Sequence, residues 1–369
     1  MSRGFFYLFI LLYTLALGYL AITLPIGPNE AKVFYTDTGV LGGLTHIAYG
    51  WFGNGLDFRL PFIFFGLFNI PLFFSISRAY FTEIEESYLA TTIFALLPGI
   101  ITSAVIVNIA VVVITLVLGF LLLHEKKQIV WQGVVMLLLL LIHDASVIFF
   151  IAIAIYFAFK RKIQLFYMAI IFLAIGLLYF NGLDIGGKPK GKFLELFGLY
   201  VALFSPLVFI YFFYALYRIW LREKKDILWY TSFTAFILSI VLSLRQQVIM
   251  TDFAPYVIVS VVLMLVIYYQ TLYVRLPRFQ GWYRWGYRVV IGSLLVFWMM
   301  IVFHKPLFYL LDDKRKHFAY PFYQPYWMML ELSEIEQNCY TSKHQKIQYQ
   351  LKYHGIEKCE DIDVPKIHK

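Results

Sequence analysis

The chain has 369 residues, of which 61% are hydrophobic, 20% aromatic and only 14% charged. Because a soluble globular domain carries nearer a quarter charged residues, this composition excludes a soluble enzyme and indicates a membrane protein with lipid as its solvent. The net charge of +9 does not indicate nucleic-acid binding, since Lys and Arg form short clusters between apolar runs, as in loops that contact anionic head groups. We therefore expect membrane lipids as partners and no nucleic acid.

Apolar runs set the predicted fold. The first run, 5–24, has about the 20 residues that a crossing needs and lacks the small-residue cleavage site of a signal peptide, so we interpret it as a retained anchor. The runs are 5–24, 61–81, 88–97, 104–123, 130–142, 146–159, 165–180, 199–221, 227–244, 256–274 and 289–303. Several are shorter than a full span. We predict an all-α polytopic membrane protein, with about eleven transmembrane helices in residues 1–303 and a small tail at 304–369.

The distribution of Lys and Arg predicts the orientation. If the N-terminus is cytoplasmic and the runs alternate, fifteen cations lie inside and six lie outside before the tail, which follows the positive-inside bias. The outer cations are Lys32, Arg59, Lys188, Lys190, Lys192 and Arg245. This places the outer loops 25–60 and 181–196 and the tail on the non-cytoplasmic side.

Glu30, just past the first run, is the first candidate for chemistry. A carboxylate in a partly dry cleft at a membrane surface can have a raised pKa and act as a base. The alternative is a solvated loop acid that caps a short helix. The sequence alone leaves both interpretations open.

Three outer cations, Lys32, Arg59 and Arg245, are candidates for binding a phosphate. A guanidinium grips phosphate through two parallel hydrogen bonds, but an Arg at a membrane boundary also snorkels to lipid head groups. A second cationic group, Lys188, Lys190 and Lys192, lies in a Gly-rich loop that either closes over an anionic lipid or rests on the membrane.

Other polar residues give weaker signals. His143 and Asp144 interrupt two apolar runs, where ionisable groups are costly and suggest function, although a turn with mutually satisfied side chains explains them equally. His46 is too isolated to predict a metal site. Cys339 and Cys359 lie in the tail, and an oxidising compartment would allow a disulfide, the alternative being two free thiols.

Several enzyme classes lack their sequence signatures in this chain. It contains no HExxH, no CxxC and no GxxxxGK[ST] motif, which argues against a metalloprotease, a thiol oxidoreductase and a P-loop ATPase.

Four short segments resemble a known family. Residues 29–32 (Asn-Glu-Ala-Lys) follow the first run, and 58–61 (Phe-Arg-Leu-Pro) open the second. Residues 97–99 (Leu-Pro-Gly) precede Asn108 at the start of the next helix, and 245–256 combine Arg, Asp and Pro before a late helix. This pattern resembles the polyprenol-phosphate-sugar glycosyltransferases with the GT-C membrane fold, which include protein O-mannosyltransferases and lipid A aminoarabinose transferases.

The resemblance implies a GT-C-like bundle that moves a sugar from a polyprenyl-phosphate donor to a lipid, glycan or protein acceptor at the outer, periplasmic face of a bacterial-type inner membrane. It implies no nucleotide or other soluble cofactor, and a divalent metal is left open. It implies Glu30, Asp37 or Asp57 as catalytic carboxylates. Lys32, Arg59 and Arg245 would then bind the donor phosphate. The residues His46, Asn108, His143 and Asp144 become candidates for acceptor binding or structure.

Two departures from the family pattern keep alternatives open. The family commonly has Asp where this chain has Asn29, and a second acid near Asn108, and an amide cannot take up a proton. A transporter, flippase or polymerase of lipid-linked glycans is one alternative, and a non-catalytic membrane scaffold on the same fold is another.

Overall fold

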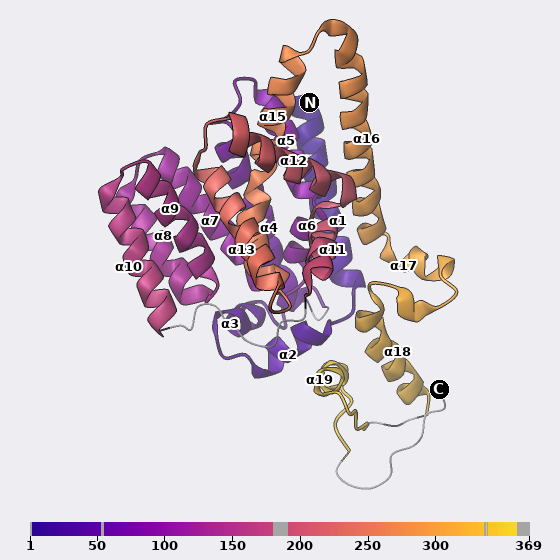
Figure 1. The fold of residues 1–369 in the computed structure, drawn as a ribbon. Coiled ribbons are helices and arrows are strands. Elements are labelled where there is room, and N and C mark those ends of the chain that lie inside the picture. Colours follow the sequence, from indigo (N-terminus) through magenta and orange to yellow (C-terminus); the bar gives the residue numbers. More distant parts are fainter. Residues whose placement is uncertain (1, 53–54, 180–190, 336, 338, 360–369) are drawn as a thin grey trace. The chain divides into compact units, whose positions relative to one another are not determined.

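The computed structural model describes residues 2–52, 55–179, 191–335, 337 and 339–359. Within these ranges the chain is helical without a β-strand (Figure 1), apart from an isolated bridge between Cys339 and Glu357. The all-α prediction is therefore confirmed for the part of the chain that the structure describes. Tertiary contacts divide it into two compact units. Unit 1 is Met1–Tyr13, Phe65–Ala104 and Ile109–Met299, and unit 2 is Thr14–Phe64, Val105–Asn108 and Met300–Lys369.

Nineteen α-helices and four 3₁₀ turns make up the described chain. The first half contains α1 Arg3–Thr23, α2 Pro28–Thr36, α3 Val40–Ile47, η1 Asp57–Arg59, α4 Leu60–Ser77, α5 Ile84–Leu96, α6 Pro98–Val105, α7 Ile109–Glu125, α8 Ile129–Ile142, α9 Ser146–Phe159 and α10 Ile163–Tyr179. The second half contains α11 Phe193–Phe204, α12 Pro206–Arg222, α13 Ile227–Ser243, α14 Met250–Val257, η2 Ile258–Ser260, α15 Val261–Val274, α16 Pro277–Val302, α17 His304–Leu307, η3 Phe308–Leu310, η4 Lys314–Lys316, α18 Tyr320–Glu334 and α19 Gln345–Tyr353.

Four described helices are long and apolar enough to cross a membrane. They are Arg3–Thr23, Asp57–Ser77, Met250–Val274 and Pro277–Val302. Two bent pairs, α5 with α6 and α11 with α12, raise the number to six if each pair forms one span. Five other apolar helices have 10–17 residues, and a 14-residue helix is only about 21 Å long. The protein is thus an all-α membrane protein, and the count of eleven crossings is not confirmed.

Proline explains both bends. Leu97 and Ser205 each precede a proline, Pro98 and Pro206, and leave helical geometry with ψ of 132° and 154°. A residue before proline is disfavoured in the α region, because the ring collides with its backbone. The helix axis therefore turns by 61° at the first break and by 105° at the second.

Unit 1 has a large apolar core formed by α4–α15, with Leu294 of α16. Helices α8, α9 and α10 lie side by side (Figure 1), and α10 and α9 share the most extensive contact. Helix α16 differs from the others, since only 11% of its most apolar window is buried. Such an exposed apolar surface is what a lipid-facing helix presents.

Contacts at the ends of helices of unit 1 join ends that the alternating topology assigns to one side. The amide of Lys192 donates to the carbonyl of Ser243 at 3.0 Å, and both residues were assigned to the outer end. The hydroxyl of Tyr273 lies 3.4 Å from Glu86 Oε1, and both belong to the inner end. These pairs agree with successive helices that run through unit 1 in alternating directions. They do not fix which end is cytoplasmic.

Unit 2 brings the tail and the loop 25–60 together. Helix α19 packs against α2 and α18, and Leu24 contributes to a small core with Ala319 and Tyr323. A disulfide joins Cys339 to Cys359, so the two thiols are paired. The tail is therefore folded onto the first loop within this unit.

Candidate functional site

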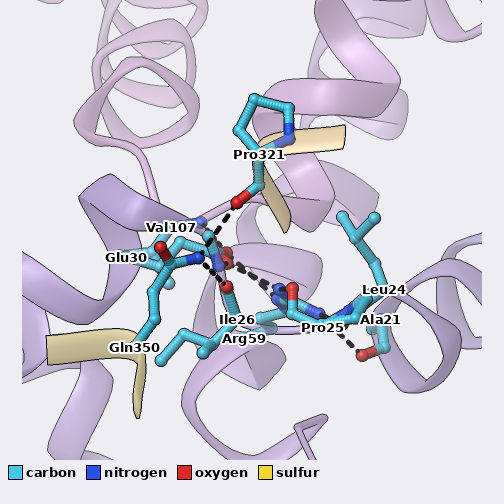
Figure 2. Close-up of polar contacts among 10 residues, drawn as sticks. Ala21, Leu24, Pro25, Ile26, Glu30, Arg59, Val107, Pro321 and Gln350 are labelled. Carbon is cyan, nitrogen blue, oxygen red and sulfur yellow. Dashed lines mark hydrogen bonds and ion pairs between the residues drawn. The ribbon is translucent and has the colours of Figure 1, made fainter. Parts of the chain in front are cut away.

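The most extensively bonded polar group of unit 2 is the ion pair between Glu30 and Arg59 (Figure 2). Glu30 is 1% exposed and Arg59 is fully buried. Arg59 Nη2 donates to Glu30 Oε2 at 2.6 Å, and Arg59 Nε donates to Glu30 Oε1 at 3.0 Å. The two side chains thus meet as a bidentate pair, the strongest arrangement of these groups.

Local sequence places Glu30 at this position. Helix α2 begins at Pro28 after the N-cap Gly27, and the Gly27 amide donates to Glu30 Oε2 at 2.7 Å. An acid in the first turn satisfies an amide that otherwise lacks a partner and interacts favourably with the helix dipole. A side chain at Gly27 would force the Phe322 ring to shift, because a Cβ there would lie 2.6 Å from that ring.

The remaining bonds of the pair tie three chain segments together. The amide of Val107 donates to Glu30 Oε1 at 2.9 Å. Arg59 Nη1 donates to the carbonyls of Ala21 and Leu24, at 2.9 and 2.6 Å, and Nη2 donates to that of Pro25 at 2.9 Å. The pair therefore fixes the end of α1, the start of α2, the segment before α4 and the turn before α7 in one place.

This hydrogen-bond set leaves neither side chain spare capacity. Arg59 has five N–H donors and all five are used, while the carboxylate of Glu30 accepts four bonds at about four lone-pair positions. A general base needs a free lone pair, and a phosphate ligand needs free donors. The observed geometry thus favours a positioning role for both residues, and the catalytic and phosphate-binding roles stay predictions.

The other two predicted carboxylates differ in accessibility. Asp57 is 2% exposed and accepts from the amides of Gly50 and Phe52 at 3.0 and 3.2 Å, which holds the preceding loop. Asp37 is half-buried, and its two oxygens accept one amide each, from Gly39 at 2.8 Å and Gly42 at 3.1 Å. Asp37 thus keeps acceptor capacity at an accessible position at the start of α3.

On the exposed face of α2 lie Asn29 and Lys32. Asn29 Oδ1 accepts a bond from Lys346 Nζ of α19 at 2.8 Å. Helix α19 contributes a second contact through Lys352, whose Nζ lies 4.8 Å from the Tyr35 ring centroid. The position that carries an acid in the resembling family is therefore an exposed amide paired with a lysine.

Sequence reasoning missed Gln350, which is 1% exposed. Its Nε2 donates to the carbonyl of Ile26 at 2.7 Å and to that of Pro321 at 3.2 Å. Nearby, burial raises the pKa of Tyr353 to about 12 and keeps that phenol neutral. A polar residue in an amphipathic tail helix gives no sequence signal for such contacts.

His46 and Asn108 occupy peripheral positions of unit 2. His46 Nε2 lies 3.0 Å from the carbonyl oxygen of Phe34, and its ring packs on the Phe34 ring at 4.5 Å between centroids. Asn108 immediately precedes α7. No group of three His, Cys, Asp or Glu side chains within the described ranges is arranged to hold a metal, and the question of a divalent metal stays open.

The remaining candidates belong to unit 1 or are not described. His143 Nε2 lies 3.7 Å from Asp252 Oδ1, a carboxylate that the sequence analysis did not select as a site. Asp144 follows His143 in the same turn, and Arg245 is exposed beyond α13. Lys188 and Lys190 fall outside the described residues. Lys192 is described and forms an ion pair of 2.9 Å with Glu195.

Comparison with known proteins adds no relative. No protein-family model matches this sequence, and no curated protein matches it. The resemblance to GT-C glycosyltransferases therefore stays a prediction.

Proposed function

We propose that this protein is a membrane glycosyltransferase that moves a sugar from a polyprenyl-phosphate donor to a lipid, glycan or protein acceptor at the periplasmic face of an inner membrane. The observation that supports this most is the Glu30–Arg59 pair. It fixes the ends of the apolar helices α1 and α4 beside the polar helix α2. A lipid-borne phosphate is presented at such a boundary between apolar and polar segments.

We propose different parts for the predicted residues. Glu30 and Arg59 position α2, because their hydrogen bonds are fully used. Asp37 takes the proton of the acceptor hydroxyl while the hydroxyl oxygen attacks the anomeric carbon of the sugar. The bond from that carbon to the phosphate breaks, and the phosphate leaves with the bonding electrons and is stabilised by the exposed Lys32.

The test is turnover by the purified full-length protein in lipid nanodiscs. Supplied with polyprenyl-phosphate sugars and acceptor extracts, it is expected to release polyprenyl phosphate. Asp37→Asn should lower the rate by about 100-fold or more, the usual contribution of a general base. Asp312→Asn, a change of an exposed acid in the tail, serves as the matched control and should keep the full rate. A folded protein that turns over none of the donors contradicts the proposal.

A specific observation supports a second candidate, a non-catalytic membrane scaffold. Asn29 carries no carboxylate, and Glu30 has no lone pair left for an acceptor proton. If the protein is a scaffold, no donor is consumed and Asp37→Asn leaves the cellular function intact. If it is a glycosyltransferase, both turnover and cellular function depend on Asp37.

A further inference from the structure

An apolar cavity of about 280 Å³ lies within unit 1, between α5, α12, α15 and α16. Its wall combines aliphatic side chains with a group of tyrosines that stack on one another. Tyr268 of α15 lies 5.2 Å from Tyr283 and 4.1 Å from Tyr287 of α16, between ring centroids. This cavity plays no part in the proposed transfer reaction.

Helix α16 forms the outer wall of the cavity and is largely exposed (Figure 1, orange). Tyr283, Gly286, Tyr287 and Val290 line the cavity at the three- and four-residue spacing of one helix face. A Cβ built at Gly286 would meet no atom within 4 Å. The cavity thus has open space at this glycine, on a helix that faces lipid.

Arginines accompany the tyrosine-rich wall. The guanidinium of Arg275 lies 4.5 Å from the ring centroid of Tyr283. Arg284 and Arg288 follow the lining residues on α16 and lie within electrostatic range of Tyr268. Glu86, at the same end of the unit, accepts a hydrogen bond from Tyr273. The cationic side chains therefore flank an apolar cavity, which matches a ligand with an apolar chain and an anionic head.

We propose that this cavity binds one acyl chain of an anionic glycerophospholipid. Arg284 and Arg288 hold its phosphate. The chain fills the space beside Gly286, and the second chain stays in the surrounding bilayer. The arginines explain the preference for an anionic head group.

Native mass spectrometry of the delipidated full-length protein tests this site. Phosphatidylglycerol and phosphatidylcholine with identical chains are titrated separately, and polyprenyl phosphate is titrated in a third arm. Wild type should bind phosphatidylglycerol about tenfold more tightly than phosphatidylcholine. Gly286→Leu should lower phosphatidylglycerol binding about tenfold by filling the cavity. Gly292→Leu is the matched control, because that glycine is on α16, has equal space and does not line the cavity.

A double variant separates head-group from chain recognition. Arg284→Gln with Arg288→Gln should bind both phospholipids equally and weakly. The proposal is overturned if Gly286→Leu binds phosphatidylglycerol like wild type, or if wild type shows no preference for it. Tighter binding of polyprenyl phosphate, blocked by Gly286→Leu, would overturn the choice of ligand. None of these outcomes depends on turnover, so the transferase proposal is tested separately.

Discussion

Burying Glu30 and Arg59 away from water costs several kcal/mol per ion, and only good geometry with further hydrogen bonds offsets that cost. The pair meets this condition, because nine donors and acceptors are matched within unit 2. Removing either partner leaves a buried, uncompensated charge.

Glu30→Gln should therefore destabilise the protein by about 3–5 kcal/mol. Chemical unfolding in detergent, followed by tryptophan fluorescence, measures the change. Glu195→Gln is the matched control, because the ion pair of Glu195 with Lys192 is one-third or more exposed and such pairs contribute about 1 kcal/mol or less. Equal stability losses in the two variants would contradict a structural role for Glu30.

His143 makes stability depend on pH. Burial lowers the pKa of its imidazole to about 4 from 6.5, so the unfolded chain binds a proton there at a pH where the folded protein does not. The contribution of neutral His143 to the free energy of unfolding is complete above pH 6.5. It is lost as the pH falls from 6.5 towards 4, by about 3 kcal/mol in all.

The comparison of wild type with His143→Asn isolates this effect. Wild type should lose more stability than the variant between pH 7 and pH 4.5, in unfolding titrations at each pH. Identical pH slopes for the two proteins would mean that His143 is not buried as the structure shows.

At the scale of elements, small residues set how closely helices pack within unit 1. A Cβ at Gly66 of α4 would lie 2.4 Å from the Cβ of Ala104 at the end of α6. Close backbone approach through small residues is a common basis of helix packing in membranes. The stretch around Gly66 is apolar throughout, so sequence alone does not distinguish this glycine from others in the bundle.

Gly66→Ala should destabilise the protein by about 1–3 kcal/mol, because the helices must separate to admit the methyl group. Gly119→Ala on α7 is the control, since a Cβ there meets nothing within 4 Å and alanine favours a helix by up to about 1 kcal/mol. Thermal aggregation midpoints in detergent report both changes. A neutral Gly66→Ala would show that α4 and α6 are not in close contact.

Most helices could be predicted from the sequence, whereas the bends within them were harder to predict. Each apolar run of the sequence overlaps an apolar helix, because hydrophobic length is a strong signal for such a helix. The run 199–221 however spans the break between α11 and α12, and α16 begins twelve residues before the run 289–303. The bends before Pro98 and Pro206 follow local steric rules, yet their angles depend on packing. Helices α2 and α3 lie in a segment that the sequence analysis treated as an outer loop.

The candidate site was only partly predictable. Glu30 and Arg59 stood out as ionisable residues at the ends of apolar runs, and the structure brings them together. Their pairing with each other, the amide of Val107 and the contacts of Gln350 depend on long-range folding that no local motif encodes. The sequence analysis treated the two charges as separate reagents, whereas their mutual hydrogen bonds use up the groups that chemistry would need.

At the scale of the whole molecule, the account depends on which segments share a side of the membrane. Unit 2 joins residues 14–64, 105–108 and the tail. Charge alternation assigns the loop 25–60 and the tail to the periplasmic side and places 105–108 at the periplasmic end of a crossing. The Cys339–Cys359 disulfide is compatible with that compartment, because disulfides persist where thiols are not kept reduced. The sugar-transfer proposal needs α2 and α3 to face the same compartment as the acceptor.

Labelling of single cysteines with a membrane-impermeant maleimide tests this central claim most directly. The two variants are Lys32→Cys and Lys126→Cys. Lys32 lies on the exposed face of α2, and Lys126 is exposed between α7 and α8. In right-side-out vesicles the first should be labelled and the second should not, and inside-out vesicles should reverse the result. Labelling of both positions from one side, or the opposite pattern, would contradict the topology and with it the proposed periplasmic transfer.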